Sequence, residues 1–101
     1  FIAPPVRPIS IRVDKTVLYA GQDIVVTCVV PRHEDNRKVE ALLPGFTASE
    51  KQLNGNDADA IWNNFTFKHV PSDVDQAVCQ LTDKYGRHAN AVQTLQVIAP
   101  Q

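Results

Sequence analysis

The residues best suited to metal or redox chemistry are three histidines, His33, His69 and His88, and two cysteines, Cys28 and Cys79. No two histidines have a ligand spacing such as His-x-x-x-His, and there is no Cys-x-x-Cys motif. Two cysteines alone cannot build a four-ligand zinc site. The sequence therefore predicts no metal site and no cofactor.

Motifs for acid–base or nucleophilic catalysis are also missing. Closely spaced aspartates occur at Asp57 and Asp59 and at Asp73 and Asp75, in segments expected to be loops, where no cleft would raise a carboxyl pKa. There is no Gly-x-Ser-x-Gly elbow and no glycine-rich phosphate loop. The 101 residues fit one small domain, and most enzymes need more chain for a core and a cleft. We therefore expect a protein that is not an enzyme.

Composition excludes two classes of partner, nucleic acid and the membrane interior. The chain carries 10 basic and 11 acidic residues, so it lacks the positive charge typical of nucleic-acid binding. Its longest apolar stretch, residues 24–30, is far shorter than the ~20 residues that cross a bilayer. Hydrophobic residues make up 44%, which favours a folded chain. We expect no nucleic acid and no direct membrane insertion.

The elements that position these residues are predicted to be strands. Apolar residues recur with a period of two, which is typical of half-buried β-strands, and no stretch of ten residues keeps a helical stripe. The alternating segments are residues 9–13, 24–30, 38–43, 65–67, 77–81 and 94–97. Turn signals separate them at Ala20-Gly21, Pro44-Gly45, Asn54-Gly55 and Tyr85-Gly86. This pattern predicts an all-β sandwich.

The two cysteines occupy inward positions, one in an early strand and one in a late strand. Cys28 and Cys79 are 51 positions apart, so a bridge between them would close most of the chain into one loop and stabilise the fold by roughly 4 kcal/mol. Their placement lets them meet across two sheets. The alternative is a pair of buried, reduced cysteines that act as small hydrophobic residues.

Both ends of the chain contain proline. Residues 1–8 hold Pro4, Pro5 and Pro8, and residues 99–101 hold Pro100. Proline cannot donate to a strand ladder and stiffens an extended segment. We therefore expect a lead-in linker at 1–8, one domain at 9–98 and the start of an outgoing linker at 99–101, as in a domain cut from a longer multidomain chain.

Three segments resemble the immunoglobulin superfamily. Residues 21–28 resemble its B strand, Asp73 resembles the Asp that lies six residues before the F-strand Cys, and residues 83–98 resemble its F–G hairpin and G strand. The resemblance implies a C2- or I-type domain: two sheets, seven or eight antiparallel strands and an inter-sheet disulfide between Cys28 and Cys79.

The chain departs from that family at two core positions. Residues 39–43 lack the usual strand-C Trp, and Ala77 stands where the tyrosine corner would be. Residues 62–67 are similar to strand E in the second immunoglobulin domain of growth-factor receptor tyrosine kinases of the platelet-derived and vascular endothelial types.

Residues 64–66 form an N-glycosylation sequon, and alternation places Asn64 on the outward face of its strand. We predict glycosylation of Asn64, which together with the cysteine pair favours an extracellular, secretory-pathway location. Trp62 shares the outward face and is a candidate binding residue, since tryptophan contributes large rigid area. The alternative is that Trp62 folds over the edge and fills the place of the missing strand-C Trp.

Two loops are predicted to gather at one end of the sandwich and form a basic binding surface. Its candidate residues are Arg32, His33, Arg37, Lys38, Lys84, Tyr85, Arg87 and His88. Such a surface suits an acidic protein partner or a sulfated glycan, whereas the opposite end would gather Asp14, Asp73 and Asp75. The alternative is a pair of merely solvated loops.

Taken with the resemblance, these features predict an extracellular protein–protein recognition module of a multidomain receptor or adhesion protein. Its partners would be a protein ligand or adhesion partner and the neighbouring domains of the same chain. The first alternative is an intracellular structural immunoglobulin domain, a filament spacer with reduced cysteines. A fibronectin-like or cadherin-like sandwich is the second.

Overall fold

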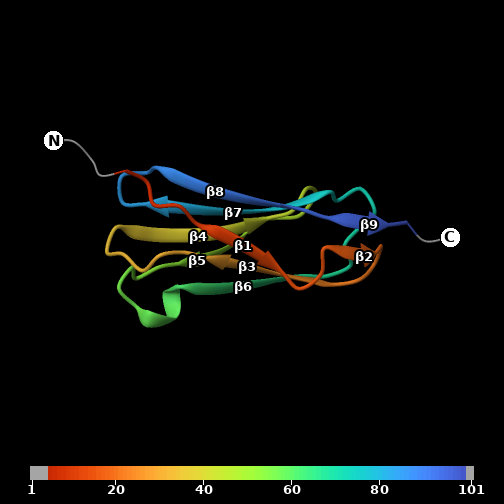
Figure 1. Cartoon of the computed structure of the whole chain (residues 1–101), viewed down its shortest axis with the longest axis horizontal. Coiled ribbons are helices and arrows are strands. Elements are labelled where there is room, and N and C mark those ends of the chain that lie inside the picture. Colours follow the sequence, from red (N-terminus) through yellow and green to blue (C-terminus); the bar gives the residue numbers. More distant parts are fainter. Residues whose placement is uncertain (1–4, 100–101) are drawn as a thin grey trace.

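This computed structural model describes residues 5–99 of the chain. They fold into nine β-strands and one short 3₁₀ helix, which are joined by loops (Figure 1). The elements are β1 (Ser10–Val13), β2 (Val17–Tyr19), β3 (Ile24–Val29), β4 (Asn36–Leu42), β5 (Ser49–Gln52), η1 (Ala58–Ala60), β6 (Trp62–Phe67), β7 (Gln76–Asp83), β8 (His88–Thr94) and β9 (Gln96–Ile98). The all-β prediction is confirmed, and the described strands outnumber the seven or eight expected.

The first sheet has three antiparallel strands in the order β1-β3-β6. Every second residue of β3 and β6 is buried, because side chains alternate across a strand. Val26 pairs with Phe65, and both side chains enter the core. The other face of this sheet is turned to solvent.

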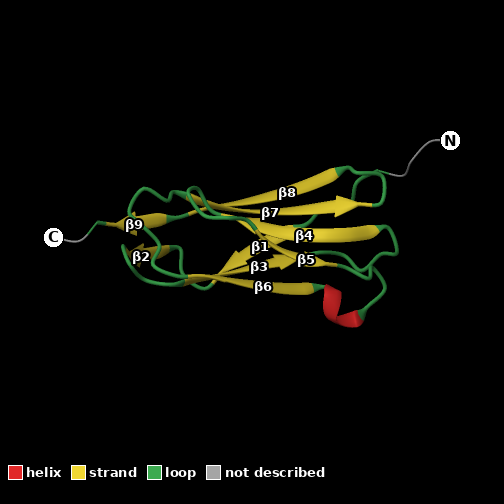
Figure 2. Ribbon diagram, turned by 180° about the vertical axis from the view of Figure 1, so that it is seen from behind, coloured by secondary structure: helices red, strands yellow, loops and turns green. Residues whose placement is uncertain are grey.

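The second sheet has four antiparallel strands in the order β5-β4-β7-β8. Val39 and Ala41 of β4 and Leu81 of β7 are buried, so aliphatic side chains occupy the β4 positions where a Trp was missing. Ala77 is likewise fully buried, as a small core residue. The two larger sheets overlap in Figure 2, and their apolar faces are buried against each other.

A disulfide joins the two sheets through the core. Cys28 of β3 and Cys79 of β7 are both fully buried, with 5.6 Å between their Cα atoms. The bridge is therefore confirmed and the alternative of reduced cysteines is wrong.

A third, two-stranded sheet was not predicted. Strands β2 and β9 pair in parallel, with Leu18 beside Val97. The last predicted strand is interrupted at Leu95, whose N–H donates to the carbonyl of Asp75 at 2.9 Å. Before Leu95 the chain pairs with β7 as β8, and after it the chain pairs with β2 as β9. The expected arrangement of two sheets is therefore corrected to three.

The predicted division into a lead-in, a domain and an outgoing linker stays a prediction. Residues 1–4 and 100–101 lie outside the described residues, so most of both expected linkers falls there. Within residues 5–99, β1 begins at Ser10 and β9 ends at Ile98. That described part has no helix long and apolar enough to cross a bilayer.

Candidate functional site

The β3–β4 loop and the β7–β8 hairpin meet at one end of the molecule. The backbone N–H of Lys84 donates to the carbonyl of Asp35 at 2.8 Å, and the Lys84 ammonium lies 3.1 Å from the Asp35 carboxylate. The side-chain hydrogen bond and the attraction to Asp35 raise the pKa of Lys84. The two segments predicted to gather are thus adjacent, and we call them, with residues 5–7, the loop end.

Asp83 organises the hairpin. Its carboxylate accepts hydrogen bonds from the backbone N–H of Tyr85 at 2.9 Å and of Arg87 at 3.0 Å, and it contacts the Arg87 guanidinium. Burial opposes ionisation of Asp83, but these hydrogen bonds and the Arg87 charge outweigh it and hold the pKa of Asp83 below the usual value of an aspartate. Gly86 completes the turn at a φ of 78°, which favours glycine.

Tyr85 lies between two cations of the same hairpin. The Lys84 ammonium is 5.3 Å and the Arg87 guanidinium carbon 5.1 Å from the centre of its ring. Both distances suit cation–π contacts. Because 38% of Tyr85 is exposed, the loop end presents an aromatic side chain together with positive charge.

The opposing loop is held by its own hydrogen bonds. Buried Asn36 donates from its side chain to the carbonyl of Pro31 at 2.6 Å, and the Nδ1 atom of His33 accepts from the N–H of Asp35 at 3.1 Å. Gly55 packs directly against the backbone carbonyl of His33, where no side chain fits. The loop before η1 therefore braces the loop that carries His33.

A small hollow of about 20 Å³, open to solvent, lies between these loops and residues 5–7. Its lining includes three basic side chains, those of Arg7, His33 and Arg87. It also includes Asp35 and Asp83, but these carboxylates already contact Lys84 and Arg87 respectively. Arg7 was not predicted, because it belongs to a segment that sequence patterning assigned to a linker.

Not every predicted binding residue joins this hollow. Lys38 lies on the four-stranded sheet, 3.8 Å from Glu40 and 3.5 Å from Glu50. His88 is exposed and hydrogen-bonds Thr82 at 3.0 Å. The remaining two candidates belong to the β3–β4 region: Arg37 donates to the carbonyl of Glu34 at 2.6 Å, and Arg32 has no hydrogen bond or ion pair with another described residue.

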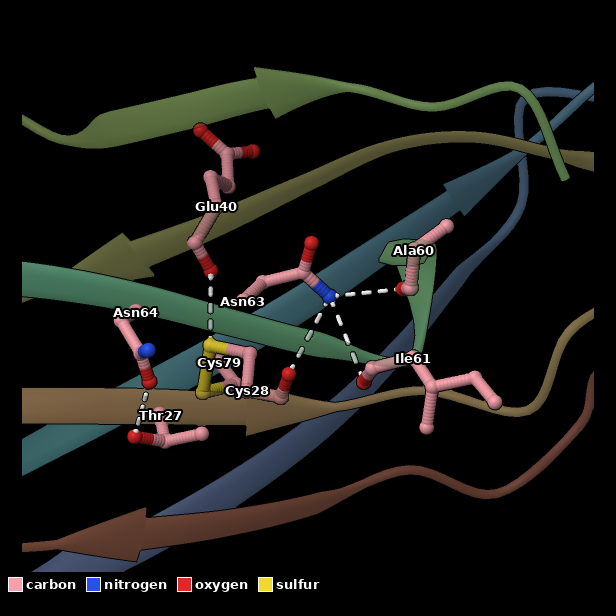
Figure 3. Close-up of a disulfide and its surroundings, with 8 residues drawn as sticks. All are labelled: Thr27, Cys28, Glu40, Ala60, Ile61, Asn63, Asn64 and Cys79. Atoms are coloured by element: carbon pink, nitrogen blue, oxygen red, sulfur yellow. Dashed lines mark hydrogen bonds between the residues drawn. A yellow bond between two sulfur atoms is a disulfide. The ribbon is translucent and has the colours of Figure 1, made fainter. Parts of the chain in front are cut away.

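Trp62 belongs to a different surface. It is 51% exposed on the outward face of β6, and the guanidinium of Arg12 on β1 lies 5.0 Å from the centre of its ring. The outward placement is confirmed, and the alternative that Trp62 fills the core is wrong. Asn64 is exposed on the same face, where the Thr27 hydroxyl donates to its side-chain oxygen at 2.6 Å (Figure 3). Glycosylation of Asn64 stays a prediction.

The neighbouring Asn63 is a core residue that the sequence analysis missed. Its amide nitrogen donates to the carbonyls of Cys28 at 3.2 Å and Ala60 at 2.9 Å, beside the disulfide (Figure 3). It is 1% exposed, and its side-chain oxygen has no hydrogen-bond partner among the described residues. Period-two alternation carries the signal for this placement, since Asn63 and Asn64 must point to opposite faces.

Residues 5–99 contain no group of three His, Cys, Asp or Glu side chains placed to hold a metal ion. His33 lies in the β3–β4 loop, His69 follows β6 and His88 begins β8. No histidine among these residues therefore belongs to a metal-ligand cluster, and both cysteines are used in the disulfide.

Comparison with known proteins finds solved structures with a similar fold. No family model and no curated protein matches the chain. Among solved structures, superoxide reductase (neelaredoxin) from Ignicoccus hospitalis is similar with a TM-score of 0.68 and 16% identity, over 90% of this chain and 80% of that one. A single-substitution variant of that reductase has a TM-score of 0.65 and 14% identity, over 87% and 79%. A chain in the structure describing T-cell specificity and activation by toxic shock syndrome toxin-1 has a TM-score of 0.56 and 9% identity, over 87% and 98%.

These comparisons correct the predictions of family and function. The immunoglobulin assignment, including the likeness to receptor tyrosine kinases, is overturned, because no family model supports it and the similar structures include superoxide reductases. The function as an extracellular receptor or adhesion module and the alternative of an immunoglobulin filament spacer fall with that assignment. No finding supports the description as a glycoprotein, and whether Asn64 itself carries a glycan stays a prediction. The exclusion of enzymes is overturned too, since superoxide reductases are enzymes with this fold. At 14–16% identity the likeness establishes the fold alone.

Proposed function

We propose that the protein is a binding module whose loop end takes the sulfate groups of a sulfated glycan. The observation that carries this proposal is the hollow lined by Arg7, His33 and Arg87. Guanidinium groups are planar donors that match the oxygens of a sulfate or phosphate in pairs. A hollow with two such groups is therefore suited to a tetrahedral oxyanion.

The charges at the loop end support an anionic partner. The acidic side chains that line the hollow already have cations: Asp35 contacts Lys84 and Asp83 contacts Arg87. Arg87 uses its Nε and Nη2 atoms for Asp83, which leaves Nη1 for a ligand. Arg7 and Arg32 have no hydrogen bond or ion pair with other described residues. These donors are available without breaking a contact that holds the loops.

Titration with heparin oligosaccharides by calorimetry tests this function. We expect binding that weakens steeply with salt, because each neutralised charge makes affinity depend on ionic strength. Arg7→Gln should weaken binding roughly 3- to 10-fold at low salt, by losing a charged hydrogen bond, and Arg32→Gln, outside the hollow, should weaken it less. Lys68→Gln removes the same charge from an exposed site after β6 and should leave affinity unchanged. The absence of binding at low salt, or equal losses in all three variants, would overturn the proposal.

The disulfide supports a location in an oxidising compartment such as the secretory pathway, where such bonds form and persist. Intact mass with and without thiol reduction, measured on protein isolated from its own cells under thiol-blocking conditions, tests this location. A mass gain of two hydrogens on reduction supports it. Two free thiols in the isolated protein would contradict it.

The similarity to superoxide reductases raises a second candidate function, electron transfer to superoxide. That reaction needs a redox-active centre, commonly a metal held by soft or imidazole ligands. Among residues 5–99 the cysteines are bridged and no three ligand side chains gather. These donors do not fit a redox metal, so we derive no step of that reaction for this chain.

A further inference from the structure

Strand β6 is an open sheet edge. It is the outermost strand along one margin of the molecule in both Figure 1 and Figure 2, and its paired edge faces β3. The N–H of Val30 donates to the carbonyl of Ile61 at 3.0 Å, which sets the alternation of the ladder. Asn63, Phe65 and Phe67 therefore direct their backbone groups to β3. By the same alternation, Trp62, Asn64 and Thr66 direct theirs away from the sheet.

These outward groups have no backbone partner in the described part of the chain. The edge is also free of the features that proteins use to block pairing, since residues 62–67 include no charge, proline or glycine. The other edges of the two larger sheets differ: β5 has four residues including Glu50 and Lys51, and the edge strands β1 and β8 run close alongside each other. The β6 edge thus offers a further strand six uncharged residues, whereas β2 and β9 of the small sheet have three residues each.

We propose that β6 pairs antiparallel with β6 of a second copy of this chain, about a two-fold axis at Asn64. In that register Trp62 faces Thr66 of the second copy, Asn64 faces its own counterpart and Thr66 faces Trp62. Every outward N–H and C=O group of one β6 then lies opposite an outward group of the other β6. The two strands can therefore form a regular antiparallel ladder with no change of register. Aromatic and β-branched residues are favourable cross-strand pairs.

Charge complementarity selects a second copy over a foreign strand. The same register, continued beyond the strand end, places Lys68 beside η1 of the second copy. Lys68 is exposed and has no hydrogen bond or ion pair with another described residue. Asp57 and Asp59 at η1 are exposed as well, and η1 lies at the start of β6 on the same margin (Figure 2). Two such opposite-charge contacts arise, one at each end of the pair.

The expected association is weak and depends on concentration. A single six-residue edge buries less than the roughly 1,200–2,000 Å² typical of stable complexes. Burial of half-exposed Trp62 beside the new strand adds apolar contact.

Sedimentation equilibrium of the disulfide-intact chain at rising concentration, without polyanion, tests the proposal. We expect the average mass to rise from the 11.2 kDa of one chain toward twice that value. Asn64→Lys places two ammonium groups opposite each other and should abolish the rise, whereas the uncharged Asn64→Gln should keep it. Thermal unfolding of both variants checks that they fold. A constant mass of one chain up to millimolar concentration, or equal association of the two variants, would overturn the proposal.

Amide hydrogen exchange provides a measurement that needs no variant. In dilute solution the amides of Trp62, Asn64 and Thr66 should exchange fast and those of Asn63, Phe65 and Phe67 slowly. Concentrating the protein should slow the first set at least tenfold and leave the second unchanged. A dimer in which the first set still exchanges fast would place the interface elsewhere and overturn the proposal. The glycan-binding experiments test residues of the loop end and not of β6. The proposed function and the proposed pairing of β6 can therefore fail independently.

Discussion

Arg87 and Asp83 lock the β7–β8 hairpin from two directions. The Arg87 side chain places Nη2 2.9 Å and Nε 3.0 Å from the same Asp83 oxygen, while its backbone N–H donates to the other carboxylate oxygen. The residue that shapes the turn is thereby also the residue that lines the hollow. Binding chemistry and local stability are therefore coupled at this site.

Asp83→Asn should lower stability at neutral pH by roughly 1–3 kcal/mol, because it replaces a charged acceptor of several hydrogen bonds. The pKa of Asp83 is lowered in the folded chain, so its contribution is present above pH 3.8 and is lost as pH falls through the folded pKa. Urea unfolding from pH 7 to pH 2 should show less acid destabilisation in the variant than in the parent. Asp73→Asn, in the exposed β6–β7 loop, is the control. Parallel curves for parent and Asp83→Asn would refute this role.

Removing the disulfide with Cys28→Ala and Cys79→Ala should destabilise the fold by about 4 kcal/mol, since the unfolded chain regains the freedom of a long closed loop. Chemical unfolding of the double variant beside the oxidised parent measures this loss. The reduced parent serves as the second reference, because it keeps both sulfur atoms. A difference below about 1 kcal/mol would mean that packing alone holds the sheets together.

Gly55→Ala should destabilise more than Gly86→Ala. A Cβ at Gly55 overlaps the backbone carbonyl of His33, so one of the two loops must move. At Gly86 the added Cβ meets open space, and the loss is the roughly 1 kcal/mol of a positive φ. Melting temperatures rank the two variants. If Gly55→Ala is the milder, the loops are not in the contact described.

Asn63→Ala and Asn64→Ala differ by one position and should differ strongly in effect. Asn63→Ala leaves the buried carbonyl of Ala60 without its side-chain donor and takes a second donor from that of Cys28, a loss of about 1–3 kcal/mol. Asn64→Ala removes one exposed hydrogen bond to Thr27 and should cost less than about 1 kcal/mol. Equilibrium unfolding compares them directly. Similar losses at both positions would be inconsistent with the opposite faces assigned to them.

Trp62→Ala should change stability by less than about 1 kcal/mol, because half of the side chain is already in water and the contact with Arg12 is exposed. Phe65→Ala, on the inward face of the same strand, should lose about 3–5 kcal/mol. Dilute protein keeps the comparison free of association. A large loss at Trp62 would indicate that it packs into the core.

The strands that could be predicted were those with a long apolar alternation. Strands β3 and β7 carry it over six and eight residues, and both were found with their inward cysteines. Strand β2 has three residues, and β5 consists of Ser, Glu, Lys and Gln, so neither has a pattern to detect. They are strands because neighbouring backbones offer them hydrogen bonds.

The candidate site was predictable only in part, for a similar reason. Lys84, Tyr85 and Arg87 were recognised as one turn, since they are close in sequence. Arg7 joins them through the path of residues 5–9, which no local pattern encodes. Short motifs were not sufficient to predict the family, the receptor function or the absence of enzyme activity. The structural similarities corrected these three predictions.

The sequence by itself determined the all-β class, the inward parity of the cysteines and the outward parity of Trp62 and Asn64. These follow from alternation along one strand, which is a local property of the backbone. Only the tertiary structure decided that there are three sheets, that Arg7, His33 and Arg87 share a hollow, and that β6 is left as an open edge. Those features depend on which distant segments pair, and pairing is decided by the hydrogen bonds and packing of the whole chain.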